Sequence, residues 1–208
     1  MELGARFDEP TDTREAAMCA TYRALCTHGY ADLTIQRISD AFPKSKSLLY
    51  HHYDSKDDLL TDFCSFMLEH FEAAMPAAED DSADEQLTAL LEFVLPADPD
   101  ADRRRFIRAM IELRAQAAAD AEYRSHFTRS SGLLQERFVD LIERGHEEGS
   151  FRSVDAERVA SLLVATVEGA MLQQATTSET HAARSVSAAR AELSAYIAAR
   201  LRVDGSPK

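Results

Sequence analysis

Apolar residues recur along this chain with the spacing of amphipathic helices. In residues 13 to 28, Met18, Tyr22 and Leu25 follow one another at four and three residues, which places them on one helical face. Alternating apolar and polar runs do not appear, and β-branched residues are sparse. The pattern therefore predicts an all-α protein of about nine helices.

Local signals indicate where the first helices begin and end. Gly29 follows the first apolar stripe and is a typical helix stop. Thr34 is placed as the N-cap of a short second helix, which Pro43 prevents from continuing. A third short helix is expected over about residues 45 to 52.

A long fourth helix is expected from Lys56 to about Met75. Ser55 and Asp58 have the spacing of a capping box, in which Ser55 is the N-cap and Asp58 reaches back to it. An acidic break that contains a proline follows at residues 76 to 84. Five further helices are predicted from the apolar positions at 87–94, 106–113 and 133–142, the last stopped at Gly145 and Gly149, and from the stretches at about 155–176 and 183–201.

The charge of the chain argues at first against a nucleic-acid partner. The net charge is -13 and the isoelectric point is about 4.9, whereas affinity for DNA comes largely from cations that neutralise phosphates. The distribution changes this view, because all the lysines except Lys208 lie close together, at Lys44, Lys46 and Lys56. The alternative is a solvated face that happens to hold three lysines.

Scarce lysine and abundant Asp and Glu are typical of proteins that work in a very salty cytosol. A halophilic source is therefore expected, and the alternative is an ordinary acidic protein kept soluble by its charge. No run of about 18 apolar residues is present, and the N-terminal residues lack the basic start and apolar stretch of a signal peptide. A cytoplasmic location with no membrane partner is the expectation.

The three cysteines form no C-x-x-C pair. Cys19, Cys26 and Cys64 are expected to be small buried or half-buried side chains in a reducing compartment, without a disulfide. The alternative is a redox sensor, since Cys19 and Cys26 share a helical face. Such a sensor needs an exposed thiol with a lowered pKa.

Residues 34 to 53 have the organisation of a helix-turn-helix. Lys44, Ser45, Lys46 and Ser47 cluster at the turn and at the start of the second short helix, where cations and short donors reach phosphates and base edges of a major groove. The amides at the first turns of the second and fourth helices also favour phosphate groups. The segment therefore predicts a reader of double-stranded DNA.

The same segment resembles the DNA-binding region of TetR-family transcriptional regulators. Where that family usually has a glycine and a small aliphatic residue in the turn, this chain has Pro43 and Lys44, so Phe42 is expected to supply the apolar anchor. The second half of the chain is similar to the C-terminal domains of such regulators at Gly145, Gly149, Phe151, Arg152 and Glu168-Gly169. The matching positions in the first region are Ile38, Ala41, Ser45, Leu49-Tyr50, His51-His52, Tyr53 and Ser55-Lys56.

The resemblance implies a three-helix DNA-binding domain at residues 1–56, followed by a ligand-binding and dimerisation bundle at 57–208. It also implies a homodimeric repressor that a small-molecule effector releases from a palindromic operator, paired through the helices at about 155–176 and 183–201. The expected DNA contacts are Thr34, Arg37, Lys44, Ser45, Lys46, Ser47, Leu48, Tyr50, His51 and Lys56.

Several of these side chains have an ordinary structural alternative. Tyr50 could pack in the core with only its hydroxyl reaching a phosphate, and Leu49 and Tyr53 are expected in the core. His51 and His52 point about 100° apart on a helix, with no third ligand spaced nearby, so no metal site is expected.

An effector pocket is implied in the second domain, although the same apolar residues would serve an ordinary core. Glu168 interrupts the most apolar helix, and burying its carboxylate is costly unless it is paired. It could recognise a cationic ligand, pair with an arginine across the dimer or lie at a solvent edge. The candidates are Phe66, Phe93, Phe106, Met110, Phe127, Phe138, Glu168 and Met171.

The chain is not expected to be an enzyme or to need a cofactor. It has no Ser/His/Asp arrangement, phosphate-binding loop or paired carboxylates anchored by spacing. The other hypothesis is an accessory protein of the same fold that acts through protein contacts instead of an operator. The intact Lys44-Ser45-Lys46 cluster argues against it.

Overall fold

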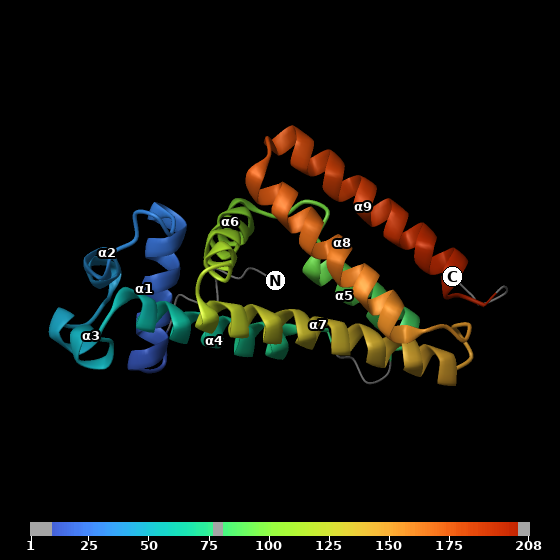
Figure 1. The fold of residues 1–208 in the computed structure, drawn as a ribbon, viewed down its shortest axis with the longest axis horizontal. Helices are drawn as coiled ribbons and strands as arrows, with labels where there is room; N and C mark the ends of the chain where they lie inside the picture. Colours follow the sequence, from blue (N-terminus) through green and yellow to red (C-terminus); the bar gives the residue numbers. More distant parts are fainter. Residues whose placement is uncertain (1–9, 77–80, 204–208) are drawn as a thin grey trace. The chain divides into compact units, whose positions relative to one another are not determined.

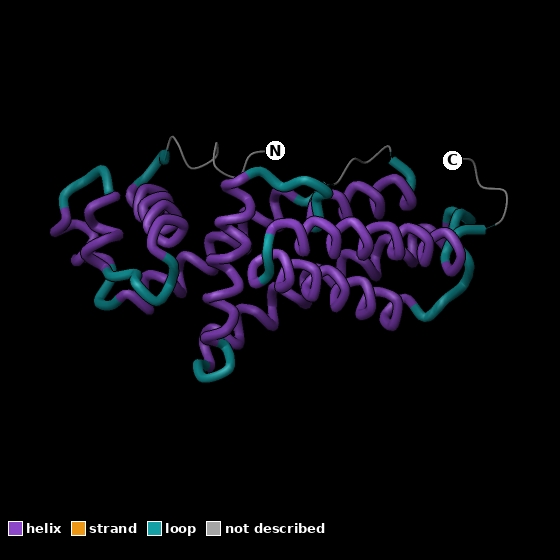
Figure 2. Tube along the Cα trace, turned by 90° about the horizontal axis from the view of Figure 1, so that it is seen from above, coloured by secondary structure: helices purple, strands orange, loops and turns teal. Residues whose placement is uncertain are grey.

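The computed structural model describes residues 10–76 and 81–203, which form nine α-helices and no strand (Figures 1 and 2). An isolated antiparallel bridge joins Phe151 to Arg202 within this part of the chain. The prediction of an all-α fold with about nine helices is confirmed. Lys208 and residues 77–80 of the acidic break at 76–84 lie outside the described residues.

The chain divides into two compact units. Unit 1 comprises the described residues up to Phe71 together with Pro99–Phe127, and unit 2 comprises Glu72–Asp98 and the described residues from Thr128 onward. The division predicted after residue 56 concerns function, and it stays a prediction. Of the helices described, none combines the length and the apolar character needed to cross a bilayer.

The first two helices of unit 1 begin with a side-chain cap. Asp12 accepts a hydrogen bond from the Glu15 amide at the first turn of α1, and Thr34 accepts one from the Arg37 amide at the first turn of α2. The predicted Thr34 cap is thus confirmed. The helices of this unit are α1 (Thr13–His28), α2 (Ile35–Ala41), α3 (Lys46–His52), most of α4 (Lys56–Ala74), α6 (Ala101–Gln116) and the first part of α7 (Ala121–Glu147).

One half of the capping box expected before α4 forms, and the other half bonds to a different residue. The Asp58 amide donates to Ser55 Oγ at 3.0 Å, as predicted for an N-cap serine. The Asp58 carboxylate, however, accepts from the Asp54 amide at 3.2 Å, so it reaches one residue beyond Ser55. The first bond satisfies an amide that the helix start leaves without a partner, and the second holds the chain just before the helix.

The core of unit 1 is built from the apolar stripes of α1, α2, α3 and α4. Met18, Ile38, Leu49 and Phe63 are fully buried in it. Phe42, which is 6% exposed, belongs to the same core and confirms the anchor expected from the altered turn. Burying such a side chain contributes about 2 kcal/mol each, which fixes α2 and α3 on the unit.

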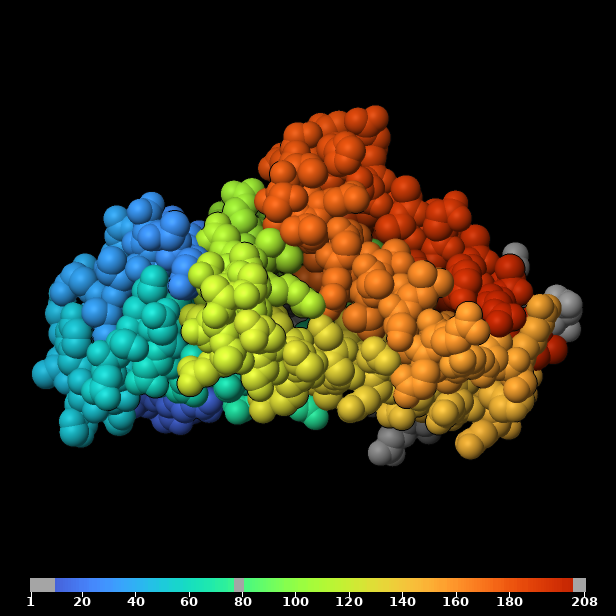
Figure 3. Space-filling view, viewed as in Figure 1, coloured from blue at the N-terminus to red at the C-terminus, as the bar shows by residue number. Residues whose placement is uncertain are grey.

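Unit 2 holds α5 (Ala83–Val94), the rest of α7, α8 (Ala156–Thr176) and α9 (Glu179–Arg200). α8 and α9 pack side by side (Figure 1), and both reach the surface on the face drawn in Figure 3. α9 begins four residues earlier than expected, at Glu179. Ser178 occupies its N-cap position, so the helix starts directly after the turn.

α7 corrects the expectation for the seventh helix. It begins at Ala121, where the Asp120 carboxylate accepts from the Glu122 and Tyr123 amides, and it runs for 27 residues. It also continues through Gly145, which was expected to stop it, and ends before Gly149, whose φ is 77°. Gly145 serves close packing instead, because a Cβ there would lie 2.1 Å from Phe151 Cδ2.

Candidate nucleic-acid interface

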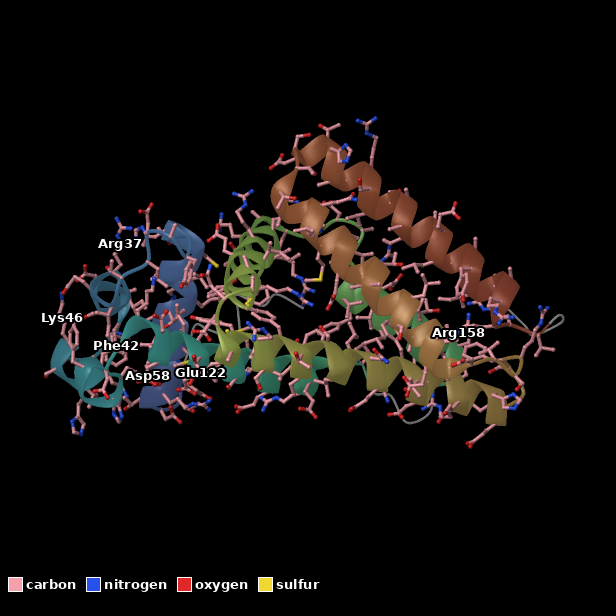
Figure 4. All side chains as sticks on the ribbon, in the orientation of Figure 1. Arg37, Phe42, Lys46, Asp58, Glu122 and Arg158 are labelled. Atoms are coloured by element: carbon pink, nitrogen blue, oxygen red, sulfur yellow. The ribbon has the colours of Figure 1, made fainter. Side chains whose placement is uncertain are left out.

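The tight turn between α2 and α3 separates a buried side from an exposed one. Ile38, Phe42 and Leu49 lie in the core of unit 1, so the opposite faces of the two helices are left to solvent. Figure 4 shows Arg37 and Lys46 at the outer edge of this motif and Phe42 inside it. The geometry presents α3, the second helix of the motif, as the element that can enter a groove.

Most of the predicted DNA contacts are exposed. Tyr50 is 46% exposed, so the alternative that its ring packs in the core is wrong. Leu48 and Lys56 are half-buried, and Leu48 packs against the core. Leu49 is buried as expected, and Tyr53 packs against the core. The exposed candidates are Thr34, Arg37, Lys44, Ser45, Lys46, Ser47, Tyr50 and His51.

The start of α3 offers two hydroxyls in addition to its lysine. Ser45 occupies the N-cap position of α3, but its side chain makes no capping hydrogen bond. Its Oγ instead lies 3.3 Å from Ser47 Oγ. Both groups are exposed and able to donate or accept at the end of a helix whose first amides favour anions.

Lys46 forms an ion pair that the sequence reading missed. Its Nζ donates to Asp40 Oδ1 at 2.5 Å, which joins the start of α3 to α2 across the turn. Gln36 Nε2 donates to the same oxygen at 2.8 Å. These bonds from Lys46 and Gln36 hold the pKa of the exposed Asp40 carboxyl below its ordinary value.

The other cations of the motif are held by uncharged groups. Lys44 Nζ donates to Thr13 Oγ1 at 2.8 Å, so the lysine in the unusual turn reaches back to the start of α1. Lys56 Nζ lies 4.3 Å from the centroid of the Tyr30 ring, a cation–π contact. Arg37 donates from its guanidinium to the backbone carbonyl of Asp32.

A polar network fixes the C-terminal end of α3 on the rest of unit 1. Arg14 of α1 donates to Asp62 of α4 through two nitrogens, Nη2 at 2.7 Å and Nε at 3.1 Å. The Tyr53 hydroxyl donates to the other oxygen of Asp62 at 2.6 Å. Burial alone would raise the pKa of Asp62, but the hydrogen bonds from Arg14 and Tyr53 outweigh it and lower the pKa.

A carboxylate of α6 binds the backbone just after the end of α1. Glu112 Oε2 accepts a hydrogen bond from the Tyr30 amide at 2.6 Å. Gly29, which precedes that amide, has a φ of 71°, and a Cβ there would lie 3.1 Å from Glu112 Oε2. The backbone just before α2 is therefore held directly by a side chain of α6.

The cysteines of unit 1 do not have the character of a redox sensor. Cys19 and Cys64 are buried, Cys26 is half-buried, and none of the three forms a disulfide with another described residue. Burial raises the pKa of Cys26 to about 11 and that of Cys64 to about 12, which keeps both thiols protonated at neutral pH. Among the described residues, no group of three His, Cys, Asp or Glu side chains is placed to hold a metal ion.

The candidates for an effector pocket fall into both compact units. In unit 1, Phe66 and Phe127 are part of the hydrophobic core, and Phe106 and Met110 pack against it. In unit 2, Phe138 is fully buried, whereas Phe93, Glu168 and Met171 are half-buried. Ser131 Oγ of α7 donates to Glu168 Oε1 at 2.6 Å.

Comparison with protein families gives two matches to this chain. A family described as "Bacterial regulatory proteins, tetR family" matches residues 18–62, which include the motif described above. A second family, described as "BetI-type transcriptional repressor, C-terminal", matches residues 83–202. The two matches cover the helix-turn-helix and all of α5 to α9.

Individual relatives agree with these families. A TetR transcription regulator from Haloarcula marismortui is 34% identical, with a TM-score of 0.82 over 92% of this chain and 100% of that one. A transcriptional regulator from Saccharomonospora viridis in complex with choline is 21% identical, with a TM-score of 0.77 over 91% of this chain and 97% of that one. The HTH-type transcriptional repressor AcnR of Corynebacterium glutamicum is 23% identical over 85% of this chain and 89% of its own length.

The matched families consist of regulators of transcription and not of enzymes, as the lack of catalytic motifs predicted. The helix-turn-helix, the nine-helix architecture and the 34% identical relative lead to one assignment. The chain belongs to the TetR family of transcriptional regulators.

Proposed function

We propose that this protein is a homodimeric repressor that binds a palindromic operator and leaves it when a small molecule binds. The observation that carries the proposal is the exposed start of α3, where Ser45, Lys46 and Ser47 face solvent while Leu49 anchors the helix from behind. Two AcnR relatives named as HTH-type transcriptional repressors support repression as the outcome. An accessory role through protein contacts alone would not need these exposed lysine and hydroxyl groups.

In the proposed complex, α3 enters a major groove and the surrounding cations contact the DNA backbone. Ser45, Lys46 and Ser47 lie at the end of α3 that meets base edges and phosphates in helix-turn-helix proteins. Thr34, Arg37 and Lys56 stand at the first turns of α2 and α4, where helix amides favour phosphates. A dimer places its two α3 helices about one helical turn, roughly 34 Å, apart along the DNA.

Lys46→Ala is expected to weaken binding to every duplex, since a lysine–phosphate contact carries no base information. The slope of log K against log salt should become shallower by at most about one, the contribution of one phosphate contact. Fluorescence anisotropy measures both effects, on a duplex selected from a random-sequence pool with the wild-type protein and on an unselected duplex. Extending the titration to molar KCl also tests the very salty cytosol that the composition predicts. Steep loss of wild-type binding above physiological salt would contradict that expectation.

Arg108→Ala is the matched control for Lys46→Ala. It removes one positive charge from α6 of the same unit, outside the helix-turn-helix. Its affinity for both duplexes should stay close to that of the wild type. An unchanged affinity of Lys46→Ala would remove Lys46 from the proposed contacts.

We infer that α8 and α9 pair with the same helices of a second copy. Leu162 and Leu172 of α8 are 45% and 49% exposed, unusual values for large apolar side chains. Together with Ala165, Gly169 and Thr176 they fall within a sector of about 80° on the helix. A two-fold axis through such a face buries the leucines of both copies, and small residues let the helices approach closely.

Gly169 supports this arrangement from another direction. Glycine in a helix interior costs about 1 kcal/mol relative to alanine. Beyond its own turn of the helix, no described atom lies within 4 Å of the position that a Cβ would take at Gly169, so packing within the described chain does not require glycine. Close approach of α8 from a second copy would explain why glycine is present at position 169.

We propose that Glu168 contacts a cationic effector. Its carboxylate is half-buried in the middle of α8 and accepts a hydrogen bond from Ser131, which orients one oxygen. The Saccharomonospora viridis regulator, which has the same fold, was crystallised with choline, a small organic cation. Phe93, Phe138 and Met171 are the apolar residues of unit 2 proposed to accompany the carboxylate in the pocket.

Choline chloride is the probe for this pocket, titrated calorimetrically in constant salt. We expect saturable binding to the wild type and at least about tenfold weaker binding to Glu168→Gln, because a contact to a charged group is lost. Glu157→Gln is the control, since Glu157 lies on the same helix and contacts Gln135. Equal affinities of wild type and Glu168→Gln would contradict the role of Glu168, and absence of any binding would exclude choline.

A further inference from the structure

We propose that Asp40 is the intramolecular counterion of Lys46, and that DNA binding exchanges this carboxylate for a phosphate, which makes binding weaker but less sensitive to salt. The proposal rests on the proposed function, in which Lys46 contacts a phosphate. It assigns a role to an acidic residue inside a DNA-reading motif, where acids would otherwise only oppose binding.

The geometry places Asp40 as a specific partner of Lys46. The Nζ to Oδ1 distance is 2.5 Å, and the two residues come from different helices on either side of the turn. Gln36, one helical turn before Asp40 on α2, donates to the same Oδ1 and keeps the carboxylate in place. Both charged side chains are more than half exposed, so the pair lies on the surface that DNA would approach.

Lys46 differs in this respect from the other cations of the motif. A hydroxyl holds Lys44, an aromatic ring holds Lys56, and a backbone carbonyl holds Arg37. When one of these cations turns to a phosphate, its neutral partner leaves no unbalanced charge behind. Asp40, by contrast, is left as an uncompensated carboxylate beside the DNA.

The effect of Asp40 on salt dependence follows from the number of cations released and taken up when DNA binds. A lysine that neutralises a phosphate releases about one cation from DNA, which makes binding fall with salt. The carboxylate of Asp40, freed at the same moment beside a negative backbone, attracts a cation from solution. This uptake offsets the release, so Lys46 contributes less salt dependence than an unpaired lysine would. Binding therefore persists better when the salt concentration is high.

Asp40→Asn is the test, measured on the selected and the unselected duplex by anisotropy over a tenfold range of KCl concentration. We expect about two- to fivefold tighter binding at the lowest salt, the range of an exposed ion pair, for both duplexes. We also expect the slope of log K against log salt to steepen by up to about one. Circular dichroism at each salt concentration checks that the variant stays folded.

A double-mutant cycle with Lys46→Gln separates exchange from general repulsion. If Asp40 acts through Lys46, Asp40→Asn changes the slope little when Lys46 is already replaced. Lys46→Gln should then flatten the slope by about one in the Asp40→Asn background, and by less in the wild type. Asp32→Asn is the matched control, since it removes the same charge from the loop before α2 and should have the same small effect in both backgrounds.

The outcomes distinguish this proposal from the one on which it rests. An Asp40→Asn slope equal to that of the wild type would overturn the role of Asp40 while leaving the repressor proposal intact. The same would follow if Asp40→Asn steepened the slope equally with and without Lys46. Failure of the wild type to bind any duplex would overturn the proposed function, and the role of Asp40 with it.

Discussion

Leu172→Arg is expected to convert the protein from a dimer to a monomer and to weaken operator binding at least about a hundredfold. Leu172 is among the most exposed large apolar side chains in the described part of the chain. In a two-fold interface every substitution occurs twice, and each buried unpaired charge costs several kcal/mol. A monomer would then engage one half-site, without the second α3 helix to hold it on the DNA.

Thr88→Arg is the control for Leu172→Arg. It places the same side chain on an exposed position of α5, outside the proposed interface. Sedimentation and light scattering at equal protein concentration measure the assembly state, and anisotropy measures binding to the selected duplex. A dimeric Leu172→Arg variant would place the interface elsewhere, and a wild type that is monomeric at micromolar concentration would overturn the dimer proposal.

The second large effect is expected from replacing glycine with alanine in α7, at two positions that are compared with each other. Gly145→Ala should destabilise the protein by about 3 kcal/mol, at the upper end for overpacking, since its Cβ would overlap the Phe151 ring. Phe151 is fully buried, and its amide donates to the Gly145 carbonyl at 2.8 Å, so the ring has little room to shift. Gly132→Ala should instead stabilise by about 0.5 to 1 kcal/mol, because alanine is the better helix former.

Scanning calorimetry at equal protein concentration tests this pair. Both glycines lie in α7, and outside the local helix backbone no described atom is within 4 Å of a Cβ built at Gly132, so the two variants differ in packing and not in helix propensity. We expect a lower Tm for Gly145→Ala and a higher one for Gly132→Ala than for the wild type. A rise in Tm for both variants would show that the Phe151 ring moves aside without cost.

The elements that could be predicted are those specified by residues close in sequence. The α1 stripe, the Thr34 cap and the turn at Pro43 all depend on neighbours within about one helical turn, and their helices appear where expected. The clustered lysines likewise pointed to DNA in spite of the net charge. Phe42 could be assigned to the core because the altered turn left an apolar position to fill.

The contacts that could not be predicted join residues far apart in sequence. Arg14 and Asp62 are separated by 48 residues, and Tyr30 and Glu112 by 82, so no local sequence spacing predicts either contact. The sequence predicts a helix stop at Gly145 for the same reason, because the Phe151 ring that requires glycine there is packed against it only in the folded chain. Asp40 had a weak signal, since Gln36 and Asp40 have helical i, i+4 spacing, but its bond to Lys46 depends on the shape of the turn.

The bond between Glu112 and the Tyr30 amide provides unit 1 with a natural spectroscopic reporter. The hydrogen bond to the carboxylate at 2.6 Å shifts the resonance of this amide proton and slows its exchange with solvent. The carboxylate belongs to α6, while the amide lies in the backbone that leads into α2. The Tyr30 signal thus reads, without any added label, whether α6 keeps its hold on the DNA-reading helices in each state of the protein.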